Sequence, residues 1–167
     1  MELPFSQACE NNKDPILEVL EVAFANASQV LEVGSGTGQH AVYFAKKLSH
    51  LEWQASDQPE YLPGVKARIE KEGVPGQPLP VEFDVFHSAP DGQFDALFTA
   101  NTCHIMPQEG VEALFNHLGD KLKSVKLLCI YGPFNDNGHF TSDSNRAFDQ
   151  SLRTRDSQMG IRDKQWI

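Results

Sequence analysis

Segments with helical periodicity alternate along the chain with short apolar runs. Apolar residues recur at helical spacing over 15–26, 39–48, 63–72, 108–123 and about 144–155, and this spacing predicts helices. Between these segments lie the apolar runs 29–33, 51–56, 81–85, 94–100 and 125–131. Most of these runs lack polar alternation, which is typical of strands that are buried on both faces of a parallel sheet.

Two helix boundaries carry a local signal. Asp14-Pro15 predicts the start of the first helix, because the Asp14 carboxylate can cap free N–H groups and proline suits the first helical position. Gly73 predicts the end of helix 63–72, since a left-handed glycine commonly follows the last helical turn.

The alternation of strands and helices predicts an α/β fold. We expect a doubly wound parallel sheet with helices on both faces and strand order 3-2-1-4-5. In such a sheet the ligand lies in the crevice at the carboxyl ends of strands 1 and 4. A length of 167 residues without a repeat or a linker predicts that 1–167 form a single domain.

Composition narrows the classes of function. A formal charge of −9 repels phosphate backbones, so we expect no nucleic-acid partner. The chain has no apolar run long enough for a membrane span and no signal-peptide pattern at its start, so we expect no membrane partner. Three cysteines and six histidines are scattered, which predicts neither a disulfide framework nor a metal site and favours a cytoplasmic protein.

The first expected strand runs directly into a glycine-rich segment, Glu32-Val33-Gly34-Ser35-Gly36-Thr37-Gly38. Glycine permits positive φ and close approach of a ligand, and the N–H groups of the next helix face the same crevice. The dinucleotide fingerprint is G-x-G-x-x-G, but here the third glycine comes one residue early and a glutamate precedes the first glycine. This spacing fits methyltransferases that bind S-adenosylmethionine (SAM), and it predicts cofactor contacts from Glu32, Gly34, Ser35, Gly36 and Gly38.

Two aspartates follow the next two expected strands. Asp57 ends the second strand, where a carboxylate can accept hydrogen bonds from ribose hydroxyls. Asp84 ends the third strand, where it can accept a hydrogen bond from the adenine amino group, with Val85 and Phe86 beside the ring. Either aspartate could instead cap a turn.

The chain is similar to a family of SAM-dependent methyltransferases long catalogued as a domain of unknown function, whose animal members are named methyltransferase-like protein twenty-six. The resemblance covers nearly the whole chain and is carried by Cys9–Leu17, Leu31–Ala41, Glu52–Asp57, Ala100–Ile105, Tyr131–Phe134, Ser144–Asp149 and Gly160–Asp163. It implies a Rossmann-like class I methyltransferase fold, SAM as cofactor and methyl transfer as the activity. Family members tend to have Arg-Asn where this chain has Asn11-Asn12, so a cationic contact there is not expected to carry over.

The chain also differs from methyltransferases of this fold at its C-terminal end. Such proteins normally add a helix, a strand and a hairpin beside strand 5, whereas this sequence stops at Trp166-Ile167. We therefore expect a domain that is truncated at the C-terminus and lacks the C-terminal hairpin. Strand 125–131 would then be an apolar edge of the sheet.

Candidate acceptor chemistry follows the fourth and fifth expected strands. His104 is the candidate general base because an imidazole titrates near neutral pH, although a structural histidine would fit the same position. Asn101 is a candidate for orienting the substrate or for holding the methionine ammonium group. Tyr131, Phe134 and Asn135 are candidates for binding the acceptor.

The sequence thus favours a SAM-dependent methyltransferase that acts on a small molecule. A SAM-binding sensor or scaffold without catalysis would use the same pocket. An NAD-dependent oxidoreductase is a third hypothesis, which the glycine spacing disfavours. The methyl acceptor and the oligomeric state are not readable from the sequence.

Overall fold

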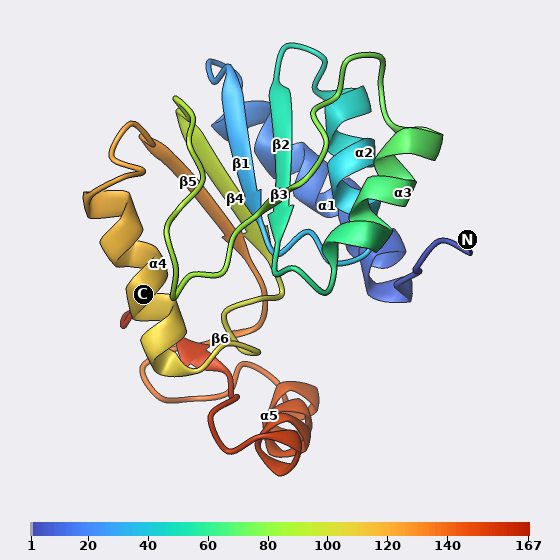
Figure 1. The fold of residues 1–167 in the computed structure, drawn as a ribbon. Coiled ribbons are helices and arrows are strands. Elements are labelled where there is room, and N and C mark those ends of the chain that lie inside the picture. The colour runs from blue at the N-terminus through green and yellow to red at the C-terminus, as the bar shows by residue number, and fades with distance from the viewer. Residues whose placement is uncertain (1) are drawn as a thin grey trace.

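A five-stranded parallel sheet forms the centre of the computed structural model, which describes residues 2–167 (Figure 1). Its strands are β1 (Gln29–Val33), β2 (Glu52–Asp57), β3 (Val81–Glu82), β4 (Ala96–Ala100) and β5 (Leu127–Tyr131). They lie in the order β3-β2-β1-β4-β5, and every pairing is parallel. The predicted α/β class and the strand order 3-2-1-4-5 are therefore confirmed.

Helices cover both faces of the sheet. The described residues form α1 (Gln7–Ala23), α2 (Gln39–Lys47), α3 (Leu62–Glu72), α4 (Gln108–Gly119) and α5 (Asp143–Arg155). On one face, residues of α1, α2 and α3 share a buried cluster with Val30 and Phe98. On the other face, Leu31 and Leu97 pack with Leu114 of α4. Neighbouring residues of β1 thus point into opposite layers, as a strand requires.

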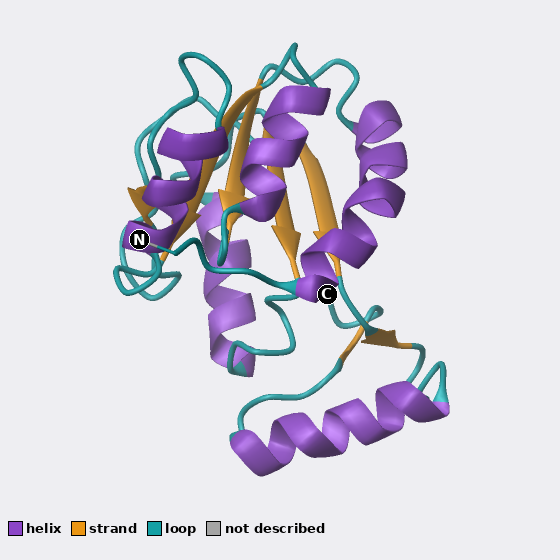
Figure 2. Cartoon of the chain, turned by 90° about the vertical axis from the view of Figure 1, so that its right-hand side faces the viewer, coloured by secondary structure: helices purple, strands orange, loops and turns teal. Residues whose placement is uncertain are grey.

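Helix α5 lies outside these two layers. A small parallel sheet of β6 (Phe134–Asn135) and β7 (Arg162–Asp163) connects it to the rest of the chain. The strand arrows of the main sheet point toward α5 in Figure 1, and Figure 2 shows α5 crossing below their ends. Strands as short as β6 and β7 carry no periodicity, so the sequence did not predict them. The helix predicted at about 144–155 is confirmed, with Ser142 as its N-cap.

The predicted start of the first helix was wrong. Helix α1 begins at Gln7, and the Ser6 hydroxyl caps it by accepting a hydrogen bond from the Cys9 N–H group. Pro15 therefore lies inside the helix, at an exposed position, where its fixed φ is compatible with helical backbone. Asp14-Pro15 does lie in a helix, but the serine cap is about two turns earlier.

Other boundaries shift for local reasons. β3 is shorter than the predicted 81–85, because the Asp84 side chain accepts a hydrogen bond from the Phe86 N–H group and turns the chain away from the sheet. Gly73 is extended, with φ of −67°, and not left-handed. Its N–H group donates to the Ile69 carbonyl oxygen at 2.8 Å, and a Cβ at this position would lie 2.4 Å from the same oxygen, so the close approach requires glycine. The predicted helix 108–123 ends at Gly119, and residues 120–124 form turns that bury Leu122.

Within residues 2–167, no helix combines the length and the apolar character that crossing a membrane requires.

An aromatic cluster gives the core a direct test. Phe98 is fully buried, with its ring centroid 5.5 Å from that of Phe44 and 5.6 Å from that of Trp53. Phe98→Ala is expected to lower the free energy of unfolding by about 3–5 kcal/mol, because it leaves a cavity between the sheet and the helices that cover this face. Urea unfolding measures this change. Val22→Ala on the exposed side of α1 is the control, and an equally small effect of both substitutions would contradict the packing.

Candidate functional site

The turn after β1 is shaped by three glycines with positive φ: 74° at Gly34, 57° at Gly36 and 75° at Gly38. A Cβ on Gly34 would lie 2.5 Å from Cγ2 of Thr102, so the backbone passes close to the loop after β4. A Cβ on Gly36 would meet no heavy atom of the described chain within 4 Å. Gly36 therefore faces open space, where a ligand can approach the backbone.

That open space belongs to a cleft of about 600 Å³ at the carboxyl ends of β1, β2 and β4. Among the predicted site residues, the cleft wall contains Gly34, Ser35, Gly36, Asp57, Val85, Asn101 and His104. The fold thus brings together segments that lie far apart in the sequence, at the edge of the sheet where ligands of α/β proteins bind.

Asp57 lies in the cleft wall with both carboxylate oxygens bonded to backbone. The Gly36 N–H group donates to Oδ2 at 2.6 Å, and the Gln58 N–H group donates to Oδ1 at 2.7 Å. Burial raises the pKa of Asp57 above its usual value, although these two hydrogen bonds act in the opposite direction. Each oxygen retains a second lone pair, so the carboxylate can still accept hydrogen bonds from a ligand.

Glu32 lies beneath the glycine turn and does not line the cleft. Its side chain is 2% exposed and accepts hydrogen bonds from the Ser35 hydroxyl at 2.7 Å and from Trp53 Nε1 at 3.2 Å. Burial raises the pKa of Glu32 to about 7. In this structure the glutamate supports the turn from below, and Ser35 lies between it and the cleft.

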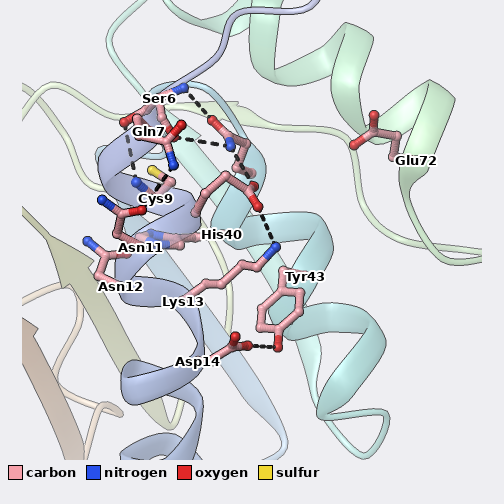
Figure 3. Close-up of polar contacts among 12 residues, drawn as sticks. Ser6, Gln7, Cys9, Asn11, Asn12, Lys13, Asp14, His40, Tyr43 and Glu72 are labelled. Carbon is pink, nitrogen blue, oxygen red and sulfur yellow. Dashed lines mark hydrogen bonds and ion pairs between the residues drawn. The ribbon is translucent and has the colours of Figure 1, made fainter.

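The first turn of α1 forms a part of the wall that the sequence did not predict. The Gln39 side chain accepts a hydrogen bond from the Ser6 N–H group at 2.6 Å and donates to Glu10 at 2.8 Å, and Glu10 pairs with Lys13 (Figure 3). These contacts fasten α1 to the start of α2 and place Ser6, Ala8 and Cys9 at the cleft. The serine N-cap is the sequence signal that could have located this turn.

The loop after β4 is held in place from two sides. The backbone of Asn101 is left-handed, with φ of 57°, and its N–H group donates to the Tyr131 carbonyl at 2.8 Å. Arg162 of β7 donates to the carbonyl of Cys103 at 3.2 Å and to that of Met106 at 2.7 Å. The segment that presents Asn101 and His104 to the cleft is therefore fixed by β5 and by the strand that follows α5.

Two histidines reach the cleft, and both are largely buried. Burial lowers the pKa of His104 to about 4, and the nearby charge of Arg162 acts in the same direction. Burial also lowers the pKa of His40 to about 4, and its Nε2 lies 2.7 Å from Oδ1 of Asn12. Both imidazoles are therefore neutral at neutral pH. The His104 ring also packs edge-on against Phe148 of α5.

Several predicted site residues lie outside the cleft wall: Glu32, Gly38, Asp84, Tyr131, Phe134 and Asn135. Asp84 is held by the Phe86 N–H group and lies 3.4 Å from Nε2 of Gln58, so it borders the wall without lining it. Asn135 is buried in β6, where its Oδ1 has no hydrogen-bond partner within residues 2–167. Their roles toward cofactor and acceptor stay predictions.

The sequence also missed most of the apolar wall. Besides Val85, the cleft is lined by the side chains Tyr61, Phe83, Phe86, Ile105, Met106, Pro107 and Phe148. Of these, Phe86 was expected beside an adenine ring. Most of the others come from loops, where the periodicity that identifies buried residues in helices and strands does not apply. Phe148 lies on α5, a helix that was predicted, but its place at the cleft depends on tertiary structure. Within the described chain, no group of three acidic, cysteine or histidine residues is placed to hold a metal ion.

The architecture is the Rossmann-like fold of class I methyltransferases. Similar solved structures include the SAM-dependent methyltransferase SibL (20% identity, TM-score 0.73), an O-methyltransferase family protein from Burkholderia thailandensis (16%, 0.78) and human N-acetylserotonin methyltransferase in complex with SAM (14%, 0.73). They cover 93%, 95% and 94% of this chain, whereas the chain covers 46%, 49% and 44% of theirs. It spans less than half the length of these proteins, and at such identities the likeness concerns the fold.

A match of the sequence to a family model identifies the family of this chain. Residues 3–167 match the family described as "Protein of unknown function (DUF938)", and the chain belongs to this family.

The buried Glu32 predicts a pH-dependent stability. The pKa of Glu32 is about 7 in the folded protein and about 4.3 in the unfolded chain, so protonation of this carboxyl group stabilises the folded state. This stabilisation is complete below about pH 4.3 and is lost as the pH rises from there through 7. The unfolding free energy of the wild type, minus that of Glu32→Gln, should therefore fall by up to about 4 kcal/mol across this window.

Urea unfolding of both proteins at a series of pH values measures this difference. The two buried histidines shift stability in the opposite direction, but they are present in both proteins and cancel. A difference that does not change with pH would show that Glu32 is not a buried, protonated group.

Proposed function

We propose that the chain binds SAM in the cleft and transfers its methyl group to a small molecule. The observation that carries this proposal is the open approach to Gly36 with the Asp57 carboxylate beside it. The comparisons support it, because the similar structures include methyltransferases. One of them contains SAM, and another, named PigF, contains SAH (S-adenosylhomocysteine). We further propose that the chain is of the type named methyltransferase-like protein twenty-six, which the sequence resembles.

The charge of the cleft supports SAM over a dinucleotide. SAM carries a positive sulfonium, whereas the pyrophosphate of NAD is negative. Among residues 2–167, no lysine or arginine lines the cleft, and Asp57 contributes a carboxylate to its wall. The whole chain has a formal charge of −9. A cationic cofactor is therefore favoured electrostatically at this site, and an anionic one is opposed.

The residues of the wall suit the parts of SAM. Asp57 would accept from the ribose hydroxyls with its remaining lone pairs, and Gly36 would leave room for the methionine portion. Val85 and Phe86 would pack against the adenine ring, with Asp84 near its amino group as the sequence predicts. Asn101 would orient the ammonium group or the acceptor. A non-catalytic sensor would bind SAM in the same way, so binding alone does not establish transfer.

Methyl transfer from SAM requires mainly that the protein align the acceptor with the methyl group. SAM supplies an activated methyl group, so the wall must place the acceptor in line with the sulfur and exclude water. The neutral His104 imidazole lies in the wall and can accept a proton from an acceptor atom as the new bond forms. Its rigid attachment through the loop after β4 would keep that proton acceptor in one place.

Asp57→Ala tests the cofactor site. The variant should bind SAM at least about tenfold more weakly in calorimetry, because the ribose hydroxyls lose a charged acceptor. Glu60→Gln removes a carboxylate from the turn that follows β2, outside the cleft wall, and controls for long-range charge. It should change the affinity much less. Equal effects of both variants, or a thermal shift by NAD larger than that by SAM, would contradict the proposal.

His104→Ala tests the proton acceptor. Transfer of labelled methyl from SAM to metabolites of a cell extract should fall by about 10²–10⁴, while SAM affinity is retained. His139→Ala, on an exposed loop outside the cleft, is the matched control. Because the pKa of His104 is about 4, the wild-type rate should show no acid limb near pH 6.5 from this residue. Absence of transfer by the wild type, despite tight SAM binding, would favour the sensor hypothesis.

A further inference from the structure

The cleft has a second side beyond the glycine turn, and this side would receive the acceptor if the proposed function holds. It is formed by Ala8 and Cys9 of α1, by His104 and Ile105 after β4, and by Phe148 of α5. Helix α5 contributes to the cleft although it lies outside the sheet layers (Figure 2). The chemistry of these residues limits what can bind beside the cofactor.

Among the residues that the structure describes, no lysine or arginine lines this side. Arg153 pairs with Asp149 at 2.9 Å. Arg162 lies behind the wall, where its guanidinium donates to backbone carbonyls, so its charge acts on His104 but its N–H groups do not face the cleft. Arg146 lies over the Phe140 ring. The two histidines of the wall are neutral at neutral pH. A carboxylate or phosphate in the cleft would therefore lose its water without gaining a charged hydrogen-bond donor from the wall.

Large apolar side chains remain partly exposed around the mouth of the cleft. Phe86 is 56% exposed, Tyr61 48%, Ile105 46% and Phe148 39%, and all four line the cleft. A group of exposed apolar side chains at a cleft commonly marks a ligand site. Of these four, Ile105 and Phe148 lie on the α5 side, and because aromatic faces and edges favour other flat rings, the Phe148 ring suits a planar ligand.

We propose that the α5 side of the cleft selects uncharged, planar ring compounds and rejects their carboxylated or phosphorylated counterparts. Phe148 and Ile105 would contact the ring, and the missing countercharge would exclude the anion. The uncharged polar groups of Asn101 and His104 would be available to the one heteroatom that receives the methyl group.

A matched pair of compounds tests the selection. The protein is loaded with S-adenosylhomocysteine and titrated in a calorimeter with naphthol, then with hydroxynaphthoate, which adds a carboxylate to the same ring. Naphthol should bind at least about tenfold more tightly. Phe148→Ala should weaken naphthol binding, whereas Val22→Ala, an exposed apolar residue of α1 outside the cleft wall, should not. Ile105→Arg should strengthen hydroxynaphthoate binding, because it adds the missing countercharge.

The design separates failure of this inference from failure of the proposed function. Affinity for S-adenosylhomocysteine is measured first in every variant, and the ring compounds are also titrated against the free protein. If the wild type binds a ring compound but not S-adenosylhomocysteine, the proposed function is overturned. Equal or tighter binding of hydroxynaphthoate, binding of neither compound, or no effect of Phe148→Ala would overturn the selection of neutral rings.

Discussion

The glycine turn depends on the hydrogen bonds that a buried carboxyl group accepts beneath it. Glu32 receives one from Ser35 in the turn and one from Trp53 in β2, so a single side chain joins the turn to two strands. Trp53 in turn packs against Phe44 and Phe98 in the core. A buried carboxyl group without partners would be costly, and these two donors hold it in one orientation. The shape of the cleft is therefore coupled to the packing of the sheet.

A second set of contacts closes the turn from above. Gln39 bonds to Ser6 and Glu10, while Arg68 of α3 donates to the carbonyls of Thr37 and Pro4. The residues before α1 and the turn after β1 are thus held by the same two polar side chains. Because Gln39 and Arg68 are both buried, these hydrogen bonds are shielded from water and favour one arrangement of the N-terminal segment. The wall at Ala8 and Cys9 follows from that arrangement.

The strands and the glycine turn could be predicted because their signals are local. The strand order could be predicted because alternating strands and helices with right-handed crossovers allow few arrangements. Apolar runs, helical spacing and glycines at fixed intervals are visible within a few residues. The predicted start of α1 was wrong because Asp14-Pro15 resembles a helix start but lies inside a helix that Ser6 caps. The wall from Tyr61, Ile105 and Phe148 could not be predicted, since these residues meet only through tertiary structure. The roles of the predicted site residues remain predictions.

The two sides of the cleft are built in different ways, and this difference has a physical consequence. The glycine-turn side is part of the sheet and its core, so its residues are constrained by packing. The α5 side is attached partly through backbone groups: Arg162 donates to carbonyls of the loop after β4, and the Gly160 N–H group donates to the carbonyl of His104. The Phe148 ring adds a side-chain contact with His104. Contacts to backbone do not depend on the identity of the side chains at 105 or 148. These backbone contacts can therefore persist when residues 105 and 148 change, whereas the packing of Phe148 on His104 depends on both side chains.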